Sequence, residues 1–474
     1  MSAPLPELVQ PVIVGAGPAG IRAAQTLVAH GLRPVLIDEA ARAGGQIYRR
    51  PPAHFERAAS TLYGSEAARA TSLHDAIDSL RDHIDYLSDS LVWNAQHGVL
   101  DVLQSATRTG LSVPYSRLII ATGATDRVLP VTGWTLPGVF TLGGAQVALK
   151  FQGCAIGEHV LFMGTGPLLY LVAYQYKKAG ANVVAVLDTA RLADQLAAVP
   201  KMLSQPAVFA KGVYYVGWLR AHGVALHSGV RPVRIHGEGE GDTRVSGVTF
   251  HDGRHERSVG CDAVAFGYAL RSETQLADLL GCSFAFAPLQ HAHLPVHDAA
   301  GRSSVEGVYL AGDGAGIMGA DAAEWAGERA ALSLLADQGV AVDTTRSTEL
   351  EHKLARLAPF REGLERAFPF PTDWAAHAPD DLVVCRCENI TAGTLRETIR
   401  ETGANEMNRL KALSRIGMGR CQGRMCAIAA TEILAHETGR PVEEVGRLRG
   451  QAPIKPIPMV MVRAQKLQHA EVQA

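Results

Sequence analysis

The first forty residues show apolar positions in the order of a strand, a helix and a second strand. Two short apolar runs, residues 11–14 and 34–37, are long enough for buried strands and flank a stretch with helical spacing. A glycine-rich segment, residues 15–20, joins the first run to this stretch, and Gly31 follows it. The order predicts a β–α–β unit of a parallel sheet. The apolar positions of the predicted helix are Ile21, Ala24, Leu27 and Val28.

The glycines of this unit have the spacing of a dinucleotide-binding turn. Gly15 permits the turn, Gly17 lets the backbone approach a pyrophosphate, and Gly20 lets the helix lie close to the strand. The second strand ends in two acids, of which Asp38 is preferred over Glu39 as the acceptor for a ribose hydroxyl because it directly ends the strand. The phosphates would face free N–H groups at the start of the helix. The residues predicted to bind nucleotide here are Gly15, Gly17, Pro18, Ala19, Gly20, Asp38 and Glu39.

The same pattern recurs near the middle of the chain. An apolar run at 160–163 leads to Gly164 and Gly166, a helical stretch follows, and a second apolar run at 183–187 ends in Asp188. From the first glycine to the glycine after the helix is 16 positions in both copies, which indicates a repeated unit. Leu169 replaces the third glycine. Three uses stay open: NAD(P)H as a substrate, an adenine nucleotide (NAD or ATP) without a redox role, which we prefer, or no ligand.

Composition limits the class of protein. Of 474 residues, 47% are hydrophobic, which suits two or three packed domains, and the formal net charge is −2, which does not favour a nucleic-acid binder. No run approaches the length of a membrane helix, and the first residues do not resemble a signal peptide. We therefore expect a cytoplasmic protein, for which peripheral membrane association stays open.

Four of the seven cysteines fall in one short region near the C-terminus. Cys385, Cys387, Cys421 and Cys426 form a C-x-C…C-x4-C pattern, which supplies four thiolates for one metal centre. Zinc accepts such a set, but nearby glycines and arginines favour a [2Fe–2S] cluster, because glycine N–H groups can bond to sulfide and arginines can offset the cluster's charge. Helices are expected from Thr391 to Thr402 and after Cys426 to about Glu437. The glycines are Gly417, Gly419 and Gly423, and the arginines are Arg386, Arg415, Arg420 and Arg424.

Several kinds of catalytic site are not visible. No cysteine pair follows Gln46, as a disulfide reductase would need, and Cys154 stands alone. No spacing predicts a nucleophile with a general base. His291, His293 and His297 are interpreted as surface or hydrogen-bonded histidines rather than metal ligands. No catalytic residue is therefore assigned.

Further segments resemble the two-dinucleotide-domain flavoproteins, which include thioredoxin reductase, glutathione reductase and ferredoxin reductases. These segments are residues 44–47, a strand and turn at 118–123, and a strand ending in Gly-Asp at 307–314. The resemblance implies FAD at the first unit, with Asp313 at the ribityl or phosphate region and the helix after residue 320 directed at the flavin ring. The C-terminal unit resembles the bacterioferritin-associated ferredoxin-like domain. The cofactor residues that this resemblance adds are Gly45, Gln46, Thr122, Gly123, Gly312 and Asp313.

The segments 133–139 and 143–146, together with the cysteine unit, resemble the alpha (A) subunits of heteromeric FAD-dependent opine oxidases, hydrogen cyanide synthases and hydroxyproline dehydrogenases. The resemblance implies an electron-transferring flavoprotein and iron–sulfur subunit of an amine (opine, D-amino or imino acid) dehydrogenase. Its donor would be a D-amino-acid-oxidase-like flavoprotein beta subunit, and the complex can include a small ferredoxin-like gamma subunit. The alternatives are a self-contained NAD(P)H-dependent ferredoxin-type reductase and a nucleotide-sensing regulatory subunit.

The expected fold is α/β, with two Rossmann-like domains of the thioredoxin and glutathione reductase type and a small, mostly helical [2Fe–2S] domain. An extended C-terminal tail is expected to dock on the body or on a partner. The predicted boundaries are 8–150 and 286–340 for the FAD domain, 151–285 for the second nucleotide domain, 341–380 for a linker, 381–450 for the [2Fe–2S] domain and 451–474 for the tail.

Overall fold

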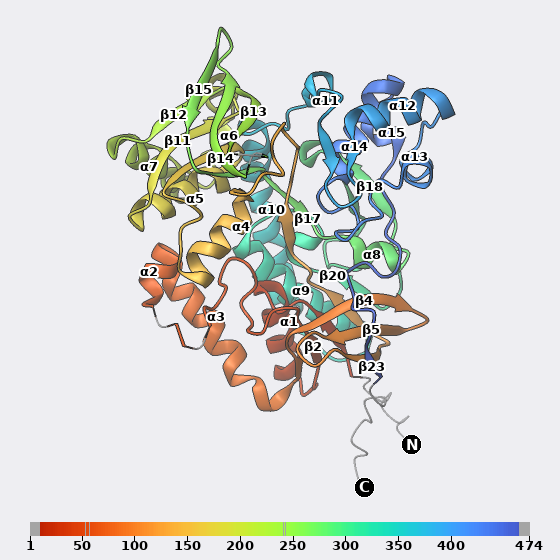
Figure 1. Ribbon diagram of the computed structural model, residues 1–474. Helices are drawn as coiled ribbons and strands as arrows, with labels where there is room; N and C mark the ends of the chain where they lie inside the picture. The colour runs from red at the N-terminus through yellow and green to blue at the C-terminus, as the bar shows by residue number, and fades with distance from the viewer. Residues whose placement is uncertain (1–9, 53, 56, 240, 242, 464–474) are drawn as a thin grey trace, which may run out of the picture.

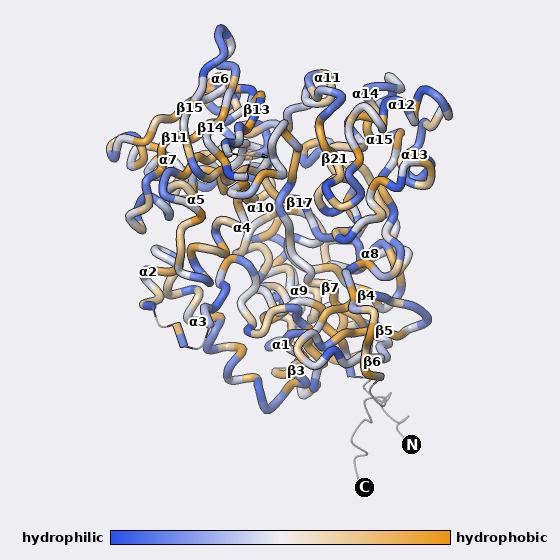
Figure 2. The backbone as a smooth tube through the Cα atoms, viewed as in Figure 1, coloured by the Kyte–Doolittle hydropathy of each residue, from blue (hydrophilic) through white to orange (hydrophobic). Residues whose placement is uncertain are grey.

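A computed structural model describes residues 10–463, except 53, 56, 240 and 242, and shows three units around a common centre (Figure 1). One continuous apolar core joins the second dinucleotide unit to the C-terminal cysteine unit, and two further cores lie mainly in the first dinucleotide unit. Figure 2 shows the hydrophobic segments gathered in the strands and central helices and the hydrophilic ones at the periphery. No helix in the described part of the chain is long and apolar enough to span a membrane.

The first unit is built on a five-stranded parallel sheet in the order β20-β7-β1-β2-β3. Its strand residues alternate between two cores because successive side chains point to opposite faces. Ile13 packs with the helices on one face, whereas Val12 and Val14 pack with an antiparallel meander on the other. The elements are β1 (Val12–Val14), α1 (Pro18–Ala29), β2 (Val35–Ile37), α2 (Ala59–Tyr63), α3 (Ala67–Ser79), β3 (Asp85–Leu87), the meander β4 (Ser90–Gln96), β5 (Val99–Gln104) and β6 (Thr109–Pro114), and β7 (Leu118–Ile120), β20 (Val308–Leu310) and α9 (Ala320–Asp337).

The second unit has a five-stranded parallel sheet in the order β12-β11-β10-β16-β9. Helices cover one face, and a three-stranded antiparallel sheet and the cysteine unit cover the other. The elements are β9 (Val139–Thr141), α4 (Leu142–Val147), the π-helical turn η3 (Ala148–Gln152), β10 (His159–Thr165), α5 (Pro167–Lys178), β11 (Asn182–Asp188), α6 (Leu192–Met202), α7 (Pro206–Ala221), β12 (Ala225–Ser228), β13 (Arg231–Glu238), β14 (Arg244–His251), β15 (Glu256–Gly260) and β16 (Ala263–Tyr268).

The boundaries between these units differ from those expected. The chain crosses between them on the antiparallel pair β8 (Ala124–Asp126) and β17 (Leu270–Ser272), so β9 already belongs to the second sheet. The stretch 341–380 contains α10 (Thr344–Ala367) and α11 (Trp374–His377) rather than an open linker. Asp343 caps α10 by accepting a hydrogen bond from the Arg346 N–H, and the helix packs against α6 and α9. Between the units lie α8 (Gln275–Leu279), β18 (Phe284–Ala287) and β19 (Ala292–Pro295).

The C-terminal unit is mostly helical, as predicted. Thr391 caps α12 through the Thr394 N–H, and Gly403 ends it in the left-handed region at φ 63°. The tail leaves this unit, and its residue Ile454 donates from its N–H to the carbonyl of Trp93 in the first unit. The elements are β21 (Val383–Cys385), β22 (Ile390–Thr391), α12 (Ala392–Thr402), α13 (Met407–Ser414), α14 (Ala427–Thr438), α15 (Val442–Val445) and the tail strand β23 (Val462–Arg463), which pairs with β6.

Candidate flavin and cysteine sites

The first glycine turn packs too closely for side chains at two of its three glycines. Gly15 has φ +107°, and a Cβ there would lie 2.2 Å from the Ala121 carbonyl oxygen. A Cβ on Gly20 would lie 1.8 Å from the Gly15 oxygen, so Gly20 sets the approach of α1 to the turn. A Cβ on Gly17 would make only an ordinary contact, at 3.6 Å from the Cα of Gly45. Gly17 therefore borders open space, which suits the predicted approach of a pyrophosphate.

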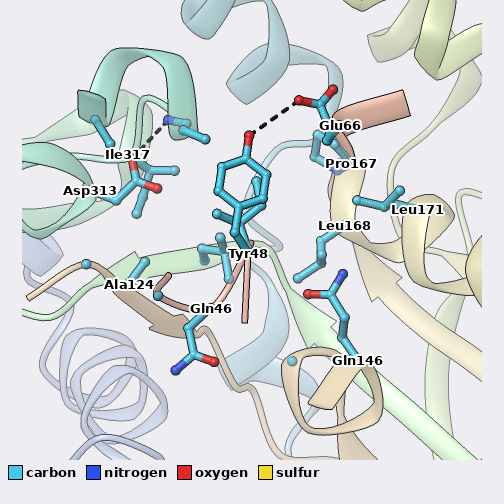
Figure 3. Close-up of a pocket in the computed structure, with 18 of the residues that line it drawn as sticks. Gln46, Tyr48, Glu66, Ala124, Gln146, Pro167, Leu168, Leu171, Asp313 and Ile317 are labelled. Atoms are coloured by element: carbon cyan, nitrogen blue, oxygen red, sulfur yellow. Dashed lines mark hydrogen bonds between the residues drawn. The ribbon is translucent and has the colours of Figure 1, made fainter. Parts of the chain in front are cut away.

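A cavity of about 2380 Å³ begins at this turn and extends between the two dinucleotide units. Figure 3 shows side chains of both units facing it, with Gln46 and Asp313 on one side and Pro167 and Leu168 on the other. Gly20 and Gly312 are not among its lining residues. Most of the residues predicted for FAD do line it: Gly15, Gly17, Pro18, Ala19, Asp38, Glu39, Gly45, Gln46, Thr122, Gly123 and Asp313.

The two acids that end β2 have different surroundings. Asp38 accepts hydrogen bonds from the backbone N–H groups of Ala16 (2.5 Å) and Ala40 (2.7 Å), one on each carboxylate oxygen. Burial raises the pKa of Asp38, and these two hydrogen bonds oppose the increase. Among the described residues Glu39 has no such backbone partners, and its exposed carboxylate accepts a hydrogen bond from Lys455 Nζ at 2.8 Å. This geometry favours Glu39, not the preferred Asp38, as the acid available to a ribose.

The start of α9 borders the cavity close to the first glycine turn, because a Cβ on Gly312 would lie within 3.2 Å of both Ala19 and Ala323. Asp313 Oδ1 accepts hydrogen bonds from the N–H groups of Met318 (2.8 Å) and Gly319 (2.9 Å), which shapes the loop before the helix. Gly319, Ala320 and Asp321 all line the cavity. The helix therefore presents its N-terminal end, with its partial positive charge, to this part of the cavity.

The second unit repeats the first but is packed differently. Val184 is an extra residue in β11, where the register with β10 shifts. This bulge explains why Asp188 lies eight positions after Gly180, whereas Asp38 lies seven positions after Gly31. Leu169 fills the position of the third glycine and is fully buried. Asp188 is also fully buried, and its oxygens accept hydrogen bonds from the Tyr170 hydroxyl (2.7 Å) and the Ala190 N–H (2.9 Å). Desolvation raises the pKa of Asp188 to about 6. Gly164, Gly166 and Asp188 do not line the large cavity.

The four C-terminal cysteines converge. The thiol of Cys426 lies near those of Cys385 and Cys421, and that of Cys387 lies near Cys421. These neighbouring thiols, aided by backbone N–H groups, lower the pKa of Cys385 to about 6 and that of Cys421 to about 5. Cys387 is exposed, whereas Cys385 and Cys426 are buried. Gly419 permits the approach, because a Cβ there would lie 2.3 Å from the Cβ of Cys387.

The cysteine unit and the cavity share one wall. Arg424, which lies between Cys421 and Cys426, makes a bidentate ion pair with Glu273 at 2.7 and 3.1 Å. Both side chains are largely buried, both line the cavity, and the carbonyl of Glu273 accepts a hydrogen bond from Thr122 at 2.6 Å. A second cavity of about 850 Å³ lies on the other side of Arg424 and is lined by Cys387 and Cys421. Sequence reasoning gave no role to Glu273, since nothing in its local pattern distinguishes it.

Two tryptophans attach the cysteine unit to the second dinucleotide unit. Trp134 is 3% exposed and donates from Nε1 to the carbonyl of Val383 at 2.6 Å, two residues before Cys385. Trp374 donates to the carbonyl of Pro130 at 2.9 Å. The segment 133–139 thus forms part of the surface on which the cysteine unit packs.

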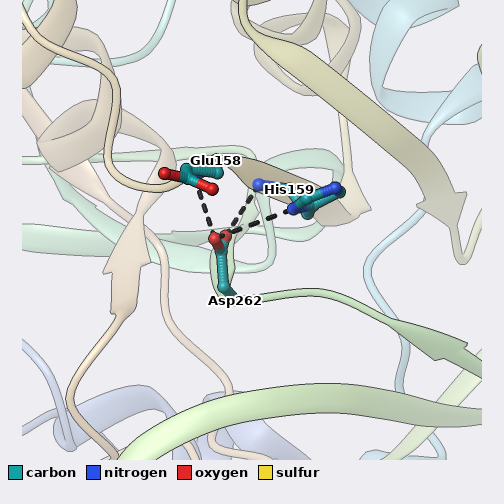
Figure 4. A group of neighbouring side chains, drawn as sticks. All are labelled: Glu158, His159 and Asp262. Carbon is teal, nitrogen blue, oxygen red and sulfur yellow. Dashed lines mark hydrogen bonds and ion pairs between the residues drawn. The ribbon is translucent and has the colours of Figure 1, made fainter.

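Two other polar clusters do not form ligand sites. Glu158, His159 and Asp262 lie close together on the surface (Figure 4), but the Asp262 carboxylate accepts hydrogen bonds from the backbone N–H groups of Glu158 (2.9 Å) and His159 (2.8 Å). The Asp262 carboxylate therefore holds the backbone at residues 158–159 in place. His291 pairs with Glu432 at 2.7 Å and stacks on Phe370, as expected for a hydrogen-bonded histidine.

Two family models match the chain. Residues 9–327 match the pyridine nucleotide-disulphide oxidoreductase model, which covers both dinucleotide units. Residues 382–466 match the sarcosine oxidase A3 domain, which covers the cysteine unit and the tail. The first match supports FAD as the occupant of the large cavity.

Similar proteins match over nearly the whole chain. The A subunit of opine oxidase from Agrobacterium tumefaciens is 36% identical over 94% of this chain and 90% of its own length. Hydrogen cyanide synthase subunit HcnB of Pseudomonas aeruginosa is 36% identical over 95% of this chain and 97% of its own length. The crystal structure of L-proline dehydrogenase from P. horikoshii shares the fold, with a TM-score of 0.70, 20% identity, and coverage of 95% of this chain and 78% of that one.

Proposed function

The chain belongs to the pyridine nucleotide-disulphide oxidoreductase family and is a relative of the opine oxidase A subunits, and on this basis we propose that it is the FAD-carrying electron-transfer subunit of a heteromeric amine or imino-acid dehydrogenase. Its substrate class would be CH–NH donors, which are oxidised on a D-amino-acid-oxidase-like partner. The names of the relatives support a heteromer, because each is called a subunit.

The shared wall between the cavity and the cysteines carries this proposal. When bound, FAD accepts electrons in pairs and releases them singly, whereas a [2Fe–2S] cluster passes one electron at a time. The Arg424–Glu273 pair holds the two sites against each other, with Arg424 between two of the cysteines and Glu273 beside Thr122. A chain that binds and connects two redox centres suits electron transfer better than bond breaking at its own nucleophile.

The arrangement of the sulfur atoms favours a cluster over zinc. Four thiolates around one zinc ion lie about 3.8 Å apart, since each Zn–S bond is about 2.3 Å. No three of the four cysteine sulfurs, all of which lie in the described part of the chain, are within 4.8 Å of one another. A two-iron centre places two sulfurs on each iron and accommodates this wider spread.

The packing of the second unit supports a structural role more than hydride transfer from NAD(P)H. Leu169 and the occupied carboxylate of Asp188 leave no acid free for a ribose in the position the motif predicts. Because this acid binds the adenosine ribose in the motif, its occupation weighs against NAD(P)H and against any other adenine nucleotide, and a structural role is the use that the packing supports best.

The decisive experiment purifies the complex from its source and measures subunit masses, flavin, iron and sulfide. We expect a second flavoprotein chain, FAD, and about two irons per copy of this chain. Cys421→Ser should remove the iron and the paramagnetic signal of the reduced protein while FAD absorption stays. Cys154→Ser, which changes a cysteine outside the cluster, is the matched control. Zinc in place of iron would contradict the cluster, and turnover of an amino acid by this chain alone would contradict the electron-transfer role.

Anaerobic mixing with NADH tests the competing reductase function. The proposal predicts that NADH leaves the flavin absorption near 450 nm, about the usual band of oxidised flavin, largely unchanged. Amine substrate added to the whole complex should bleach it. Rapid bleaching by NADH alone would favour a self-contained reductase.

A further inference from the structure

A buried lysine lies in the wall of the flavin cavity. Lys150 is 7% exposed, and its one hydrogen bond among the described residues is a long one, 3.5 Å from Nζ to the carbonyl of Ile47. Ile47 follows Gln46, and all three residues line the cavity. The mechanism of electron transfer proposed above gives this side chain no role.

The backbone that carries Lys150 is unusual. Residues 148–152 form a π-helical turn directly after α4, and single π-turns of this kind are frequent at functional sites. Gly153 ends the turn in the left-handed region at φ 72°, and a Cβ there would lie 2.3 Å from the ring of Phe55. The neighbouring Phe151 lies under the guanidinium of Arg49 at 5.7 Å. The turn is therefore held on both sides of Lys150.

The charge of Lys150 has no counter-ion in the described part of the chain. Burial lowers its pKa to about 8, and no charged group contributes to that shift. The ammonium thus stays mostly protonated at neutral pH. By contrast, Lys211, which lines the same cavity, pairs with Glu66 at 2.6 Å, and Glu66 also contacts Tyr48 (Figure 3). A buried cation without a counter-ion is energetically costly, so the position of the Lys150 ammonium in the cavity wall indicates that an anionic group binds in the cavity.

We propose that Lys150 is a charge-stabilising residue of the flavin site, whose ammonium offsets the negative charge that the flavin ring gains on reduction. Two electrons from the partner flavoprotein and one proton from solvent reduce the ring fully, so the ring gains one negative charge. The start of α9 supplies a partial positive charge at the same cavity, and Lys150 adds a full one from the opposite unit. The inference rests on the proposed function, because it needs FAD in this cavity.

The test measures the flavin itself in the purified complex. Sulfite, which adds to the flavin ring and leaves it negatively charged, reports the same electrostatic stabilisation without turnover. We expect Lys150→Met to keep FAD, to bind sulfite about tenfold more weakly and to lower the two-electron midpoint potential by about 30 mV, the equivalent of a factor of ten. Lys150→Arg should retain near-native values. Lys177→Met, which removes the same charge from α5 at a position outside the cavity lining, should behave like the native protein.

The outcomes separate this inference from the proposed function. A native protein without FAD would contradict both. Lys150→Met with bound FAD, unchanged sulfite affinity and unchanged potential would overturn the role of Lys150 alone. If Lys150→Met fails to fold, Lys150→Gln provides a second neutral variant with a polar end, and the same unchanged values would overturn the inference.

Discussion

The two dinucleotide units have the same order of elements but differ in what fills the space around the acid after the second strand. In the first unit, Gly20 lets α1 approach the turn, and Glu39 follows the backbone-bound Asp38 toward the cavity. In the second, Leu169 occupies the glycine position, and Thr189 stands where the first unit has Glu39. The comparison shows that a repeated turn predicts a backbone shape, whereas the side chains packed on it decide whether a ligand can use that shape.

Exchanging the third glycine is the most severe way to break the comparison. Gly20→Leu should prevent the first unit from folding correctly and abolish FAD binding, because its Cβ would lie 1.8 Å from the Gly15 oxygen. The matched variant Leu169→Ala should destabilise the second unit by about 2–5 kcal/mol through a cavity but leave FAD bound. Flavin content and thermal unfolding measure both. A yellow, stable Gly20→Leu protein would contradict the packing argument.

The buried acid of the second unit should make stability depend on pH. The pKa of Asp188 is about 6 in the folded chain and near 3.8 when unfolded, so the folded state binds more protons between these values. The native protein should therefore lose stability as pH rises from about 4 to about 6. Asp188→Asn should lack this loss and gain up to about 3 kcal/mol relative to the native protein between about pH 4 and pH 7. Denaturant unfolding at several pH values measures the difference, and a constant difference would contradict the shift.

The sequence predicted both sheets, and most of the predicted cofactor residues line the large cavity, because these depend on local patterns. Apolar runs, glycine spacing and the cap at Thr391 act within a few residues, and the structure confirms the elements they predicted. The four cysteines also converge as their spacing suggested. Which of Asp38 and Glu39 is free to bind a ribose depends on the hydrogen bond from the Ala16 N–H to Asp38. Ala16 lies more than twenty positions away, so no local pattern reveals this contact.

The remaining differences arise from long-range packing. α10 carries alternating charges with few apolar positions, so its place in the stretch 341–380, for which a linker is predicted, depends on its contacts with α6 and α9. Lys150 and Glu273 are ordinary residues in sequence, and they become distinctive only because distant elements bury them beside the same cavity.

Replacing Glu39 by threonine, the residue that the second unit has at the corresponding position 189, tests whether Glu39 or Asp38 binds the ribose. Glu39→Thr should weaken FAD binding about tenfold, or about 1.4 kcal/mol, through loss of the proposed ribose contact. Equilibrium dialysis or the return of flavin fluorescence on dilution measures the affinity. Lys455→Met serves as the control, because it removes only the ion-pair partner of Glu39. An equal loss in both variants would show that Glu39 acts by holding the tail, and an unchanged affinity in Glu39→Thr would return the ribose contact to Asp38.

Removing one hydrogen bond from Asp188, the acid of the second unit, is expected to have the smallest effect. Tyr170→Phe removes the hydroxyl that donates to Asp188, while Ala190 and Gln195 still donate, so unfolding should become easier by about 1 kcal/mol. The pKa of Asp188 should rise further, because the Tyr170 hydroxyl helps to keep it ionised. The variant should still not be reduced by NADH, since Leu169 remains in the glycine position. NADH titration under anaerobic conditions measures this, and rapid flavin bleaching in Tyr170→Phe would show that one hydroxyl, rather than the packing of the whole unit, separates the second site from a working nicotinamide site.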